Sequence, residues 1–408
     1  MIEYIEVIMK IAVLYFDINQ IGGVLQCITD MTSGFEKLGH TVDTYKLRYT
    51  ETYKKPVLGR ETKEKVLGSN LGIDSQVMWF GETQAISDTL EILNTYDQII
   101  FQRGCPSQNS NAGREAGTSW QKVYKAKPPK YMVVHDPWMF KFYPWQLEVA
   151  NKLEAICPIH LPSWNTTEDW PGRRVWIPFP VNFDPMKHKR PLVKRQDWVT
   201  MLCVWKPWNH PEILLRNMPN INADVRLYGK GLSYYYIAGD QKKRKKTYQN
   251  PDGSWLWESV DGESHYHGVI PTEEKWKVFG NSKIIISLAS NASWPANTVR
   301  VVVEGIVARS DVCTYGDNIG VNDAGDDGLI PNNAVVLFKN KTKIYPKINR
   351  VLQNIEEYQE MVDVGREQVM SVFSDTAVCQ SWLDLFEGKV DTAIRHNFTK
   401  VKRSKNVV

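Results

Sequence analysis

The stretch IAVLYFDINQIGGVLQCITDMTSGFEKLGHTVDTYKL, residues 11–47, decides the fold class. It opens with a short apolar run, Ile11 to Tyr15, that is typical of a buried strand. A Gly22-Gly23 turn follows, and apolar residues then recur at the spacing of one helix face: Val24, Cys27, Ile28, Met31 and Phe35. After this helix, Thr41 to Leu47 is the next strand-like run. The order strand, glycine loop, helix, strand predicts a unit of a parallel α/β sheet.

The same alternation continues along the chain. Strand-like runs occur at residues 98–101, 131–134, 155–159, 198–204, 224–228, 284–288 and 335–338, and helical patterns at 211–218, 298–308, 349–373 and 375–386. Arg174 to Asp184 carries two prolines and is interpreted as a linker. We therefore predict a doubly wound α/β domain over residues 1–180 and a second one over 181–374. Residues 375–408 are predicted to form a helix that returns toward the N-terminal domain, followed by a basic tail.

Length and composition fit this division. A chain of 408 residues with 42% hydrophobic and 24% charged residues is too long for one ordinary core and suits two soluble domains.

No apolar run reaches the roughly 18 residues of a membrane span, and Met1 to Lys10 has no basic region typical of a signal peptide. Translation starts at Met1 or at Met9. The six scattered cysteines form no CxxC pair, so we expect neither zinc nor disulfides, and a cytoplasmic location.

Five segments, in order, resemble the large family of retaining GT-B glycosyltransferases. They are Ile21–Val24, Ile177–Pro185, Leu227–Gly231, Tyr266–Ser290 and Trp294–Thr314. The resemblance extends from about Lys10 to Gly388 and is strongest in the second half. It implies two Rossmann-like domains that face each other across a cleft, with a UDP-sugar bound by the C-terminal domain.

The last segment contains the most informative donor-binding pattern. A loop that leads into a helix N-terminus presents free N–H groups and a positive dipole end, which suit a diphosphate. Asn297, Thr298 and Val299 would supply these amides, and the resemblance assigns the ribose hydroxyls to Glu304. An ordinary helix carboxylate is the alternative for Glu304, although an unpaired charge within VVVEGIV would be expensive. Ala296 stands where the family has a glutamate that contacts the sugar, so a donor other than the usual hexose is expected.

Other donor contacts are predicted from glycines and lysines at strand ends. Gly22 and Gly23 permit close approach of the backbone to a phosphate or sugar, or they form only a tight turn. Lys206 is the cation nearest to the position of the family's basic pair. Gly229 and Lys230 belong to the LYGKG segment, where Lys230 supplies a second positive charge to the diphosphate, unless either lysine is merely solvated.

His135 and Asp136 follow the strand 131–134, at the strand end where ligands of open α/β sheets bind. By resemblance, His135 approaches the transferred sugar. Asp136 would be the general base if the reaction inverts the anomeric centre, or it only starts a turn with Pro137. The sequence contains no D-x-D pair, so we predict a reaction that needs no metal and no other cofactor, with amide dipoles and lysines stabilising the leaving diphosphate.

The acceptor is predicted from the segment Leu232 to His265, which the family does not share. It carries a basic run and two tryptophans: Lys242, Lys243, Arg244, Lys245, Lys246, Trp255 and Trp257. Cations that neutralise phosphates beside aromatic rings that can stack on bases favour nucleic acid. The alternatives are a solvated basic loop, rings that bind acceptor sugars, and ordinary core packing.

The donor-binding segments, taken together with the basic and aromatic segment Leu232 to His265, make the chain similar to bacteriophage DNA glycosyltransferases and their arabinosyltransferase relatives. The resemblance implies transfer of a pentose such as arabinose, or of glucose, to 5-hydroxymethylcytosine in double-stranded DNA, which protects it from restriction. The modified base would then leave the duplex or be contacted in the major groove. Such an enzyme would act as a monomer in the cytoplasm of an infected bacterium. Two other functions stay open: a glycosyltransferase for lipopolysaccharide or another surface glycan, and a non-catalytic nucleotide-sugar or nucleic-acid binder.

Overall fold

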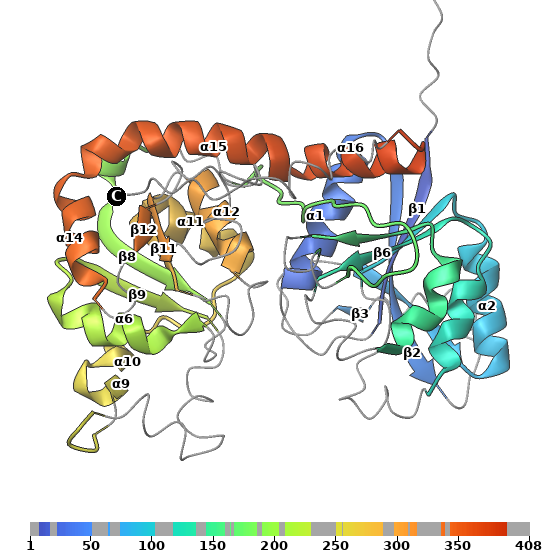
Figure 1. The fold of residues 1–408 in the computed structure, drawn as a ribbon, viewed down its shortest axis with the longest axis horizontal. Helices are drawn as coiled ribbons and strands as arrows, with labels where there is room; N and C mark the ends of the chain where they lie inside the picture. Colours follow the sequence, from blue (N-terminus) through green and yellow to red (C-terminus); the bar gives the residue numbers. More distant parts are fainter. Residues whose placement is uncertain are drawn as a thin grey trace, which may run out of the picture. The chain divides into compact units, whose positions relative to one another are not determined.

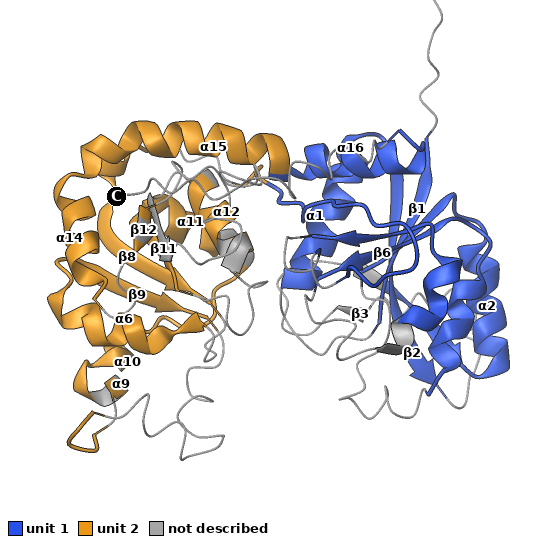
Figure 2. Cartoon of the chain, in the orientation of Figure 1, with its two compact units in different colours: residues 1–182, 373–399 blue, residues 183–372, 400–408 orange. Residues whose placement is uncertain are grey.

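Two sheets, each dominated by parallel strands, organise the computed structural model of the chain (Figure 1). The structure describes residues 8–16, 23–50, 64–65, 74–102, 117–135, 144–159, 164, 167–185, 190–203, 209–229, 250–254, 256–288, 298–308, 311–315, 336–338 and 343–389. The chain divides into two compact units (Figure 2). Unit 1 comprises residues 1–182 and 373–399, and unit 2 comprises residues 183–372 and 400–408.

The sheet of unit 1 has the strand order β3-β4-β2-β1-β5-β6-β7 in the described residues. The strands are β1 (Lys10–Phe16), β2 (Thr41–Thr50), β3 (Glu64–Lys65), β4 (Asp74–Gly81), β5 (Gln98–Phe101), β6 (Lys130–Val134) and β7 (Ala155–Pro158). All neighbouring pairs are parallel except β3 with β4. β1 and β6 are buried along nearly their whole length, which explains their continuous apolar sequence.

The helical elements of unit 1 pack on this sheet through apolar faces. They are α1 (Gly23–Lys37), α2 (Thr83–Leu93), η1 (Ser119–Lys125), η2 (Pro144–Lys152) and α16 (Asp375–Phe386). α1 packs against β2 and α16, and α2 packs against β4. The Glu82 side chain caps α2, because its Oε2 accepts hydrogen bonds from the amides of Gln84 and Ala85. The aromatic rings of Phe16 and Trp120 belong to the same core.

The sheet of unit 2 has the order β12-β11-β10-β8-β9 in the described residues, and all its pairs are parallel. The strands are β8 (Gln196–Leu202), β9 (Asp224–Tyr228), β10 (Ser282–Ser287), β11 (Asp311–Tyr315) and β12 (Val336–Phe338). The helical elements are η3 (Leu192–Lys194), α6 (Pro211–Asn217), η5 (Met218–Asn220), α9 (Leu256–Ser259), α10 (Gly262–His265), α11 (Thr272–Asn281), α12 (Thr298–Val307), α14 (Tyr345–Gln353), η8 (Ile355–Tyr358) and α15 (Gln359–Phe373).

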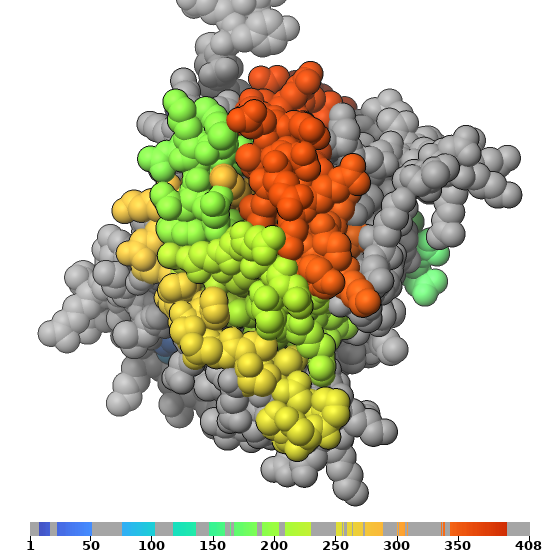
Figure 3. Space-filling view, turned by 90° about the vertical axis from the view of Figure 1, so that its left-hand side faces the viewer, coloured from blue at the N-terminus to red at the C-terminus, as the bar shows by residue number. Residues whose placement is uncertain are grey.

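Two residues of unit 2 join α14 to the earlier part of the unit. The Asn217 side-chain oxygen accepts a hydrogen bond from the amide of Ile344, just before α14 begins. Asn349 on α14 donates to the carbonyl of Asn220 and accepts from the amide of Asn222. Figure 3 shows this face of unit 2, on which the orange-red segment of α14 and α15 lies beside a yellow-green segment from earlier in the same unit. No helix of the described residues is long and apolar enough to span a bilayer.

Each predicted strand corresponds to a strand of the structure within a few residues: β1, β2, β5, β6, β7, β8, β9, β10 and β12. The prediction of two α/β sheets of the doubly wound type is also confirmed. The helical pattern predicted over residues 349–373 is confirmed, but it does not form one continuous helix. The structure has α14, η8 and α15 there, because Asn354 (φ −118°, ψ 33°) leaves the helical conformation between α14 and η8. β4 and α2 were not predicted at all.

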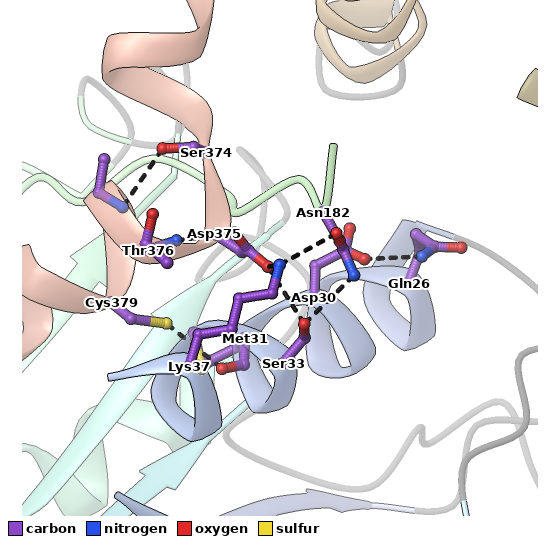
Figure 4. Close-up of polar contacts among 11 residues, drawn as sticks. Gln26, Asp30, Met31, Ser33, Lys37, Asn182, Ser374, Asp375, Thr376 and Cys379 are labelled. Carbon is purple, nitrogen blue, oxygen red and sulfur yellow. Dashed lines mark hydrogen bonds and ion pairs between the residues drawn. The ribbon is translucent and has the colours of Figure 1, made fainter. Parts of the chain in front are cut away.

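The helix α16 is fixed to α1 by close packing and by buried charge (Figure 4). Lys37 Nζ lies 2.6 Å from Asp375 Oδ2, whose side chain is only 5% exposed. Ser33 Oγ donates to the same oxygen at 3.2 Å, and Ser374 Oγ caps α16 by accepting from the amide of Ala377. Backbone hydrogen bonds also join Val181 to Phe373 and to Asp375. The segments where the chain leaves unit 1 and re-enters it are therefore paired side by side.

Gly34 allows α1 and α16 to approach this closely. A Cβ at this position would lie 2.4 Å from the Asp375 carbonyl oxygen and 2.6 Å from Cys379 Sγ. We expect Gly34→Ala to destabilise the protein by about 1–3 kcal/mol, because the clash with the α16 backbone forces the helices apart. Thermal unfolding should show a Tm several degrees lower. Gly23→Ala is the control, since a Cβ there meets no atom within 4 Å; equal Tm values for the two variants would contradict this packing account.

Candidate functional site

The carboxyl ends of β1, β5 and β6 lie at one edge of the unit 1 sheet. β1 pairs with β2 on one side and with β5 on the other, so the chain leaves it in opposite directions. The amide of Gln102, the residue after β5, donates to the Leu14 carbonyl of β1 at 2.8 Å. Open α/β sheets bind ligands at such a switch point, outside the strand ends.

His135 follows β6 at this edge and is held by Gln102. Its Nε2 lies 2.9 Å from Gln102 Oε1, and Gln102 is 0% exposed. The other end of the Gln102 amide donates to Met31 Sδ of α1 at 3.2 Å. Gln102 was missed by the sequence analysis. A polar side chain directly after an apolar strand, next to the strand that carries His135, was the available signal.

The remaining predicted residues of unit 1 are only partly described. Gly23 is the first residue of α1, so its amide belongs to the helix N-terminus that follows β1. Gly22 and Asp136 lie outside the described residues, and their predicted roles stay predictions. The structure thus brings Gly23, Gln102 and His135 to one edge of the sheet.

Unit 2 has a second switch point, between β8 and β10. β8 pairs with β9 on one side and with β10 on the other. The helix α12 follows β10 in the chain and begins at Thr298, where the sequence analysis expected a helix N-terminus. Thr298 and Val299 are its first two residues, so their amides are among those without an intrahelical acceptor. Asn297 lies outside the described residues.

Glu304 is buried on α12 beside two cations. Its side chain is 2% exposed, and its Oε1 lies 2.7 Å from Lys275 Nζ on α11 and 3.0 Å from Arg300 Nε on α12. The cost of an unpaired charge therefore does not count against the alternative of an ordinary helix carboxylate, because Lys275 and Arg300 pair with Glu304. Both of these hydrogen bonds, from Lys275 and Arg300, are made to Oε1.

These two cations differ in how readily a sequence shows them. Arg300 precedes Glu304 by four residues, a spacing that places both side chains on one face of a helix. Lys275 lies 29 residues away on another helix, so only the tertiary structure brings it to Glu304. The arrangement fixes the Glu304 carboxyl group through one of its two oxygens.

Gly229 directly follows β9, and its N–H and C=O groups already form hydrogen bonds within the protein. Its amide donates to the Gly268 carbonyl at 2.8 Å, and its carbonyl accepts from the Tyr266 hydroxyl. The φ of Gly229 is +129°, a conformation that favours glycine. In this conformation the Gly229 N–H is therefore not available to a diphosphate. The nucleotide sugar could still pack closely against the Gly229 backbone, because glycine has no side chain.

The cations and tryptophans predicted to bind donor and acceptor lie mostly outside the described residues: Lys206, Lys230, Lys242, Lys243, Arg244, Lys245, Lys246 and Trp255. Trp257 belongs to α9, but its side chain is outside the description. Among the described residues, no group of three or more histidine, cysteine, aspartate or glutamate side chains is arranged to hold a metal ion.

Comparisons of sequence find no protein-family model and no curated protein that matches the chain. Comparisons of structure find many matches over nearly its full length. HepE from Anabaena in complex with UDP and glucose matches with a TM-score of 0.63 and 13% identity, covering 93% of this chain and 100% of its own. A glycosyltransferase from Rickettsia africae matches with a TM-score of 0.60 and 14% identity, covering 94% and 99%.

A third match is an α-glucosyltransferase in complex with UDP and a 13-mer DNA that contains a HMU base. Its TM-score is 0.64 at 10% identity, and the alignment covers 93% of this chain and 100% of the other. At such low identity these matches establish the fold, and they agree with the two parallel sheets described above. The chain has the GT-B fold of these glycosyltransferases.

Proposed function

We propose that this chain is a glycosyltransferase that takes a sugar from a UDP-sugar donor. The observation that carries this proposal is the switch point of unit 2. There α12 begins after β10, and Glu304 lies further along the same helix. A helix N-terminus suits a diphosphate, and a fixed carboxylate suits ribose hydroxyls. Structures of the same fold contain UDP, which supports this choice of nucleotide.

In this mechanism the amides of Asn297, Thr298 and Val299 stabilise the negative charge that develops on the leaving diphosphate. Lys206 and Lys230 add positive charge, so the reaction is proposed to need no metal. Glu304 accepts hydrogen bonds from the ribose through Oε2. In unit 1, His135 contacts the transferred sugar.

The stereochemical course depends on Asp136. If Asp136 acts as a general base, the acceptor hydroxyl loses its proton to this carboxylate and the anomeric centre inverts. The family resemblance instead favours retention. Ala296, in place of the family's sugar-contacting glutamate, supports a donor other than the usual hexose, such as UDP-arabinose, with UDP-glucose as the other candidate.

The proposed acceptor is 5-hydroxymethylcytosine in double-stranded DNA. One protein of the same fold has been captured with UDP and DNA, which shows that this fold accommodates both ligands in that protein. The basic run from Lys242 to Lys246 supplies five cations in succession, which suits the phosphate backbone. A glycosylated phage genome would be protected from restriction.

A glycan or other small acceptor is the second candidate. AviGT4, a glycosyltransferase involved in avilamycin A biosynthesis, matches with a TM-score of 0.53 at 11% identity, covering 93% of this chain and 97% of its own. The fold alone therefore does not select DNA. The basic run is the feature that favours DNA over this alternative.

The donor site is tested by Glu304→Gln. The amide keeps the size of the side chain but removes the charge, so we expect UDP to bind about tenfold more weakly, or about 1.4 kcal/mol. Isothermal titration calorimetry with UDP measures this, and thermal unfolding confirms that the variant is folded. Glu274→Gln, on the exposed face of α11, is the matched control and should bind UDP as the parent does. Undiminished UDP affinity in folded Glu304→Gln would place the ribose elsewhere.

The DNA contact is tested by replacing Lys242, Lys243 and Lys245 with glutamine. We expect duplex affinity to fall and its dependence on salt concentration to flatten, because up to three fewer counterions are released on binding. The control replaces Lys122, Lys125 and Lys127, three exposed lysines of unit 1, with glutamine. Fluorescence anisotropy at several salt concentrations gives both slopes. Identical slopes for the two triple variants would remove the argument for DNA from the basic run.

A further inference from the structure

The buried amide of Gln102 has two neighbours that together determine its orientation. Its Nε2 lies 3.2 Å from Met31 Sδ, and its Oε1 lies 2.9 Å from His135 Nε2. Gln102 is 0% exposed, so bulk water does not compete for either contact in this conformation. A thioether sulfur carries no hydrogen and can only accept, so the NH2 end of the amide must face Met31. The carbonyl end therefore faces His135.

This orientation determines where His135 carries its hydrogen. A carbonyl oxygen can only accept a hydrogen bond, so His135 Nε2 must be the donor and must be protonated. Neutral His135 is then the Nε2–H tautomer, and Nδ1 is its basic nitrogen. The opposite amide orientation would set the carbonyl lone pairs against the sulfur lone pairs and lose one of the two hydrogen bonds.

We propose that Gln102 is a positioning residue that holds His135 as the Nε2–H tautomer. In neutral His135, Nδ1 is then the nitrogen that accepts a hydrogen bond, whether from the protein or, in the proposed function, from a hydroxyl group of the sugar. The assignment of a sugar rests on the proposed function, whereas the tautomer does not. Proton exchange through Nε2 is excluded while Gln102 holds it.

The same chain contains histidines that serve as internal references. His265 Nδ1 lies 2.8 Å from the Val225 carbonyl, which only accepts, so His265 is expected as the opposite, Nδ1–H tautomer. His40 Nδ1 accepts from the Met9 amide at 3.2 Å, so neutral His40 is expected as the Nε2–H tautomer. His135 should therefore resemble His40 and differ from His265.

The test is a long-range ¹H–¹⁵N correlation spectrum of the full chain with ¹⁵N-labelled histidine, recorded above the pH at which histidine titrates. The His135 signals are those that vanish in His135→Gln. We expect a protonated Nε2 and an unprotonated Nδ1. A His135 pattern like that of His265 would overturn the proposal.

Three variants separate positioning from general structural effects. Gln102→Met removes the acceptor at similar size and should abolish the preference for Nε2–H. Gln102→Glu restores an acceptor and should restore the preference. Gln121→Met, the same substitution at a residue of unit 1 that hydrogen-bonds Glu148, should leave His135 unchanged. An unaltered His135 tautomer in folded Gln102→Met would overturn the role of Gln102.

The outcome stays separate from that of the proposed function, because the spectrum requires no substrate. UDP is added in a second titration of the same sample. A chain that binds no UDP but shows the Nε2–H pattern and its loss in Gln102→Met would retain the positioning contact and refute the donor assignment. A chain that binds UDP but shows the Nδ1–H tautomer at His135 would retain the donor assignment and refute the positioning role of Gln102.

Discussion

Parallel pairing on both sides of one strand in each sheet, β1 in unit 1 and β8 in unit 2, is the constraint on which the candidate site depends. β1 has β2 and β5 as neighbours, and β8 has β9 and β10, so each sheet is wound in both directions from that strand. Parallel strands bring all their carboxyl ends to one edge, and reversal of the winding opens a crevice there. Gly23, Gln102 and His135 in unit 1, and Thr298 in unit 2, follow these strand ends because of the pairing.

Buried carboxylates show how each unit accommodates charge in its interior. Asp375 is neutralised by Lys37 and joins α16 to α1, whereas Glu304 is held by Lys275 and Arg300. Removing one partner of such a pair costs more than the pair contributes, since the other charge stays buried. The ion pair between Asp375 and Lys37 holds α16 against α1. The hydrogen bonds to Glu304 use one of its oxygens, and the proposed donor site assigns the other to the ribose.

The sequence predicted those features that local pattern determines. Continuous apolar strands, the glycine turn before α1 and the start of α12 all follow from side-chain periodicity and helix capping, and the structure confirms the strands. β4 was missed because Asp74–Gly81 mixes polar and apolar residues, and the break at Asn354 follows no proline or glycine signal. Lys275 could not be assigned because Glu304 is 29 residues away on another helix, and for Gln102 the position after an apolar strand was the only local signal, since His135 is 33 residues away. Gly22, Asp136, Lys206, Lys230, Asn297 and the basic run remain predictions.

The most direct test of the central claim, sugar transfer from a UDP-sugar, is mass spectrometry of a transfer reaction. The purified chain is incubated with DNA containing 5-hydroxymethylcytosine and with UDP-glucose or UDP-arabinose, and the DNA is then digested to nucleosides. The account predicts that the modified cytidine gains the mass of one hexose or one pentose, with release of UDP. Release of no UDP from either donor, with or without DNA, by a folded protein would contradict it.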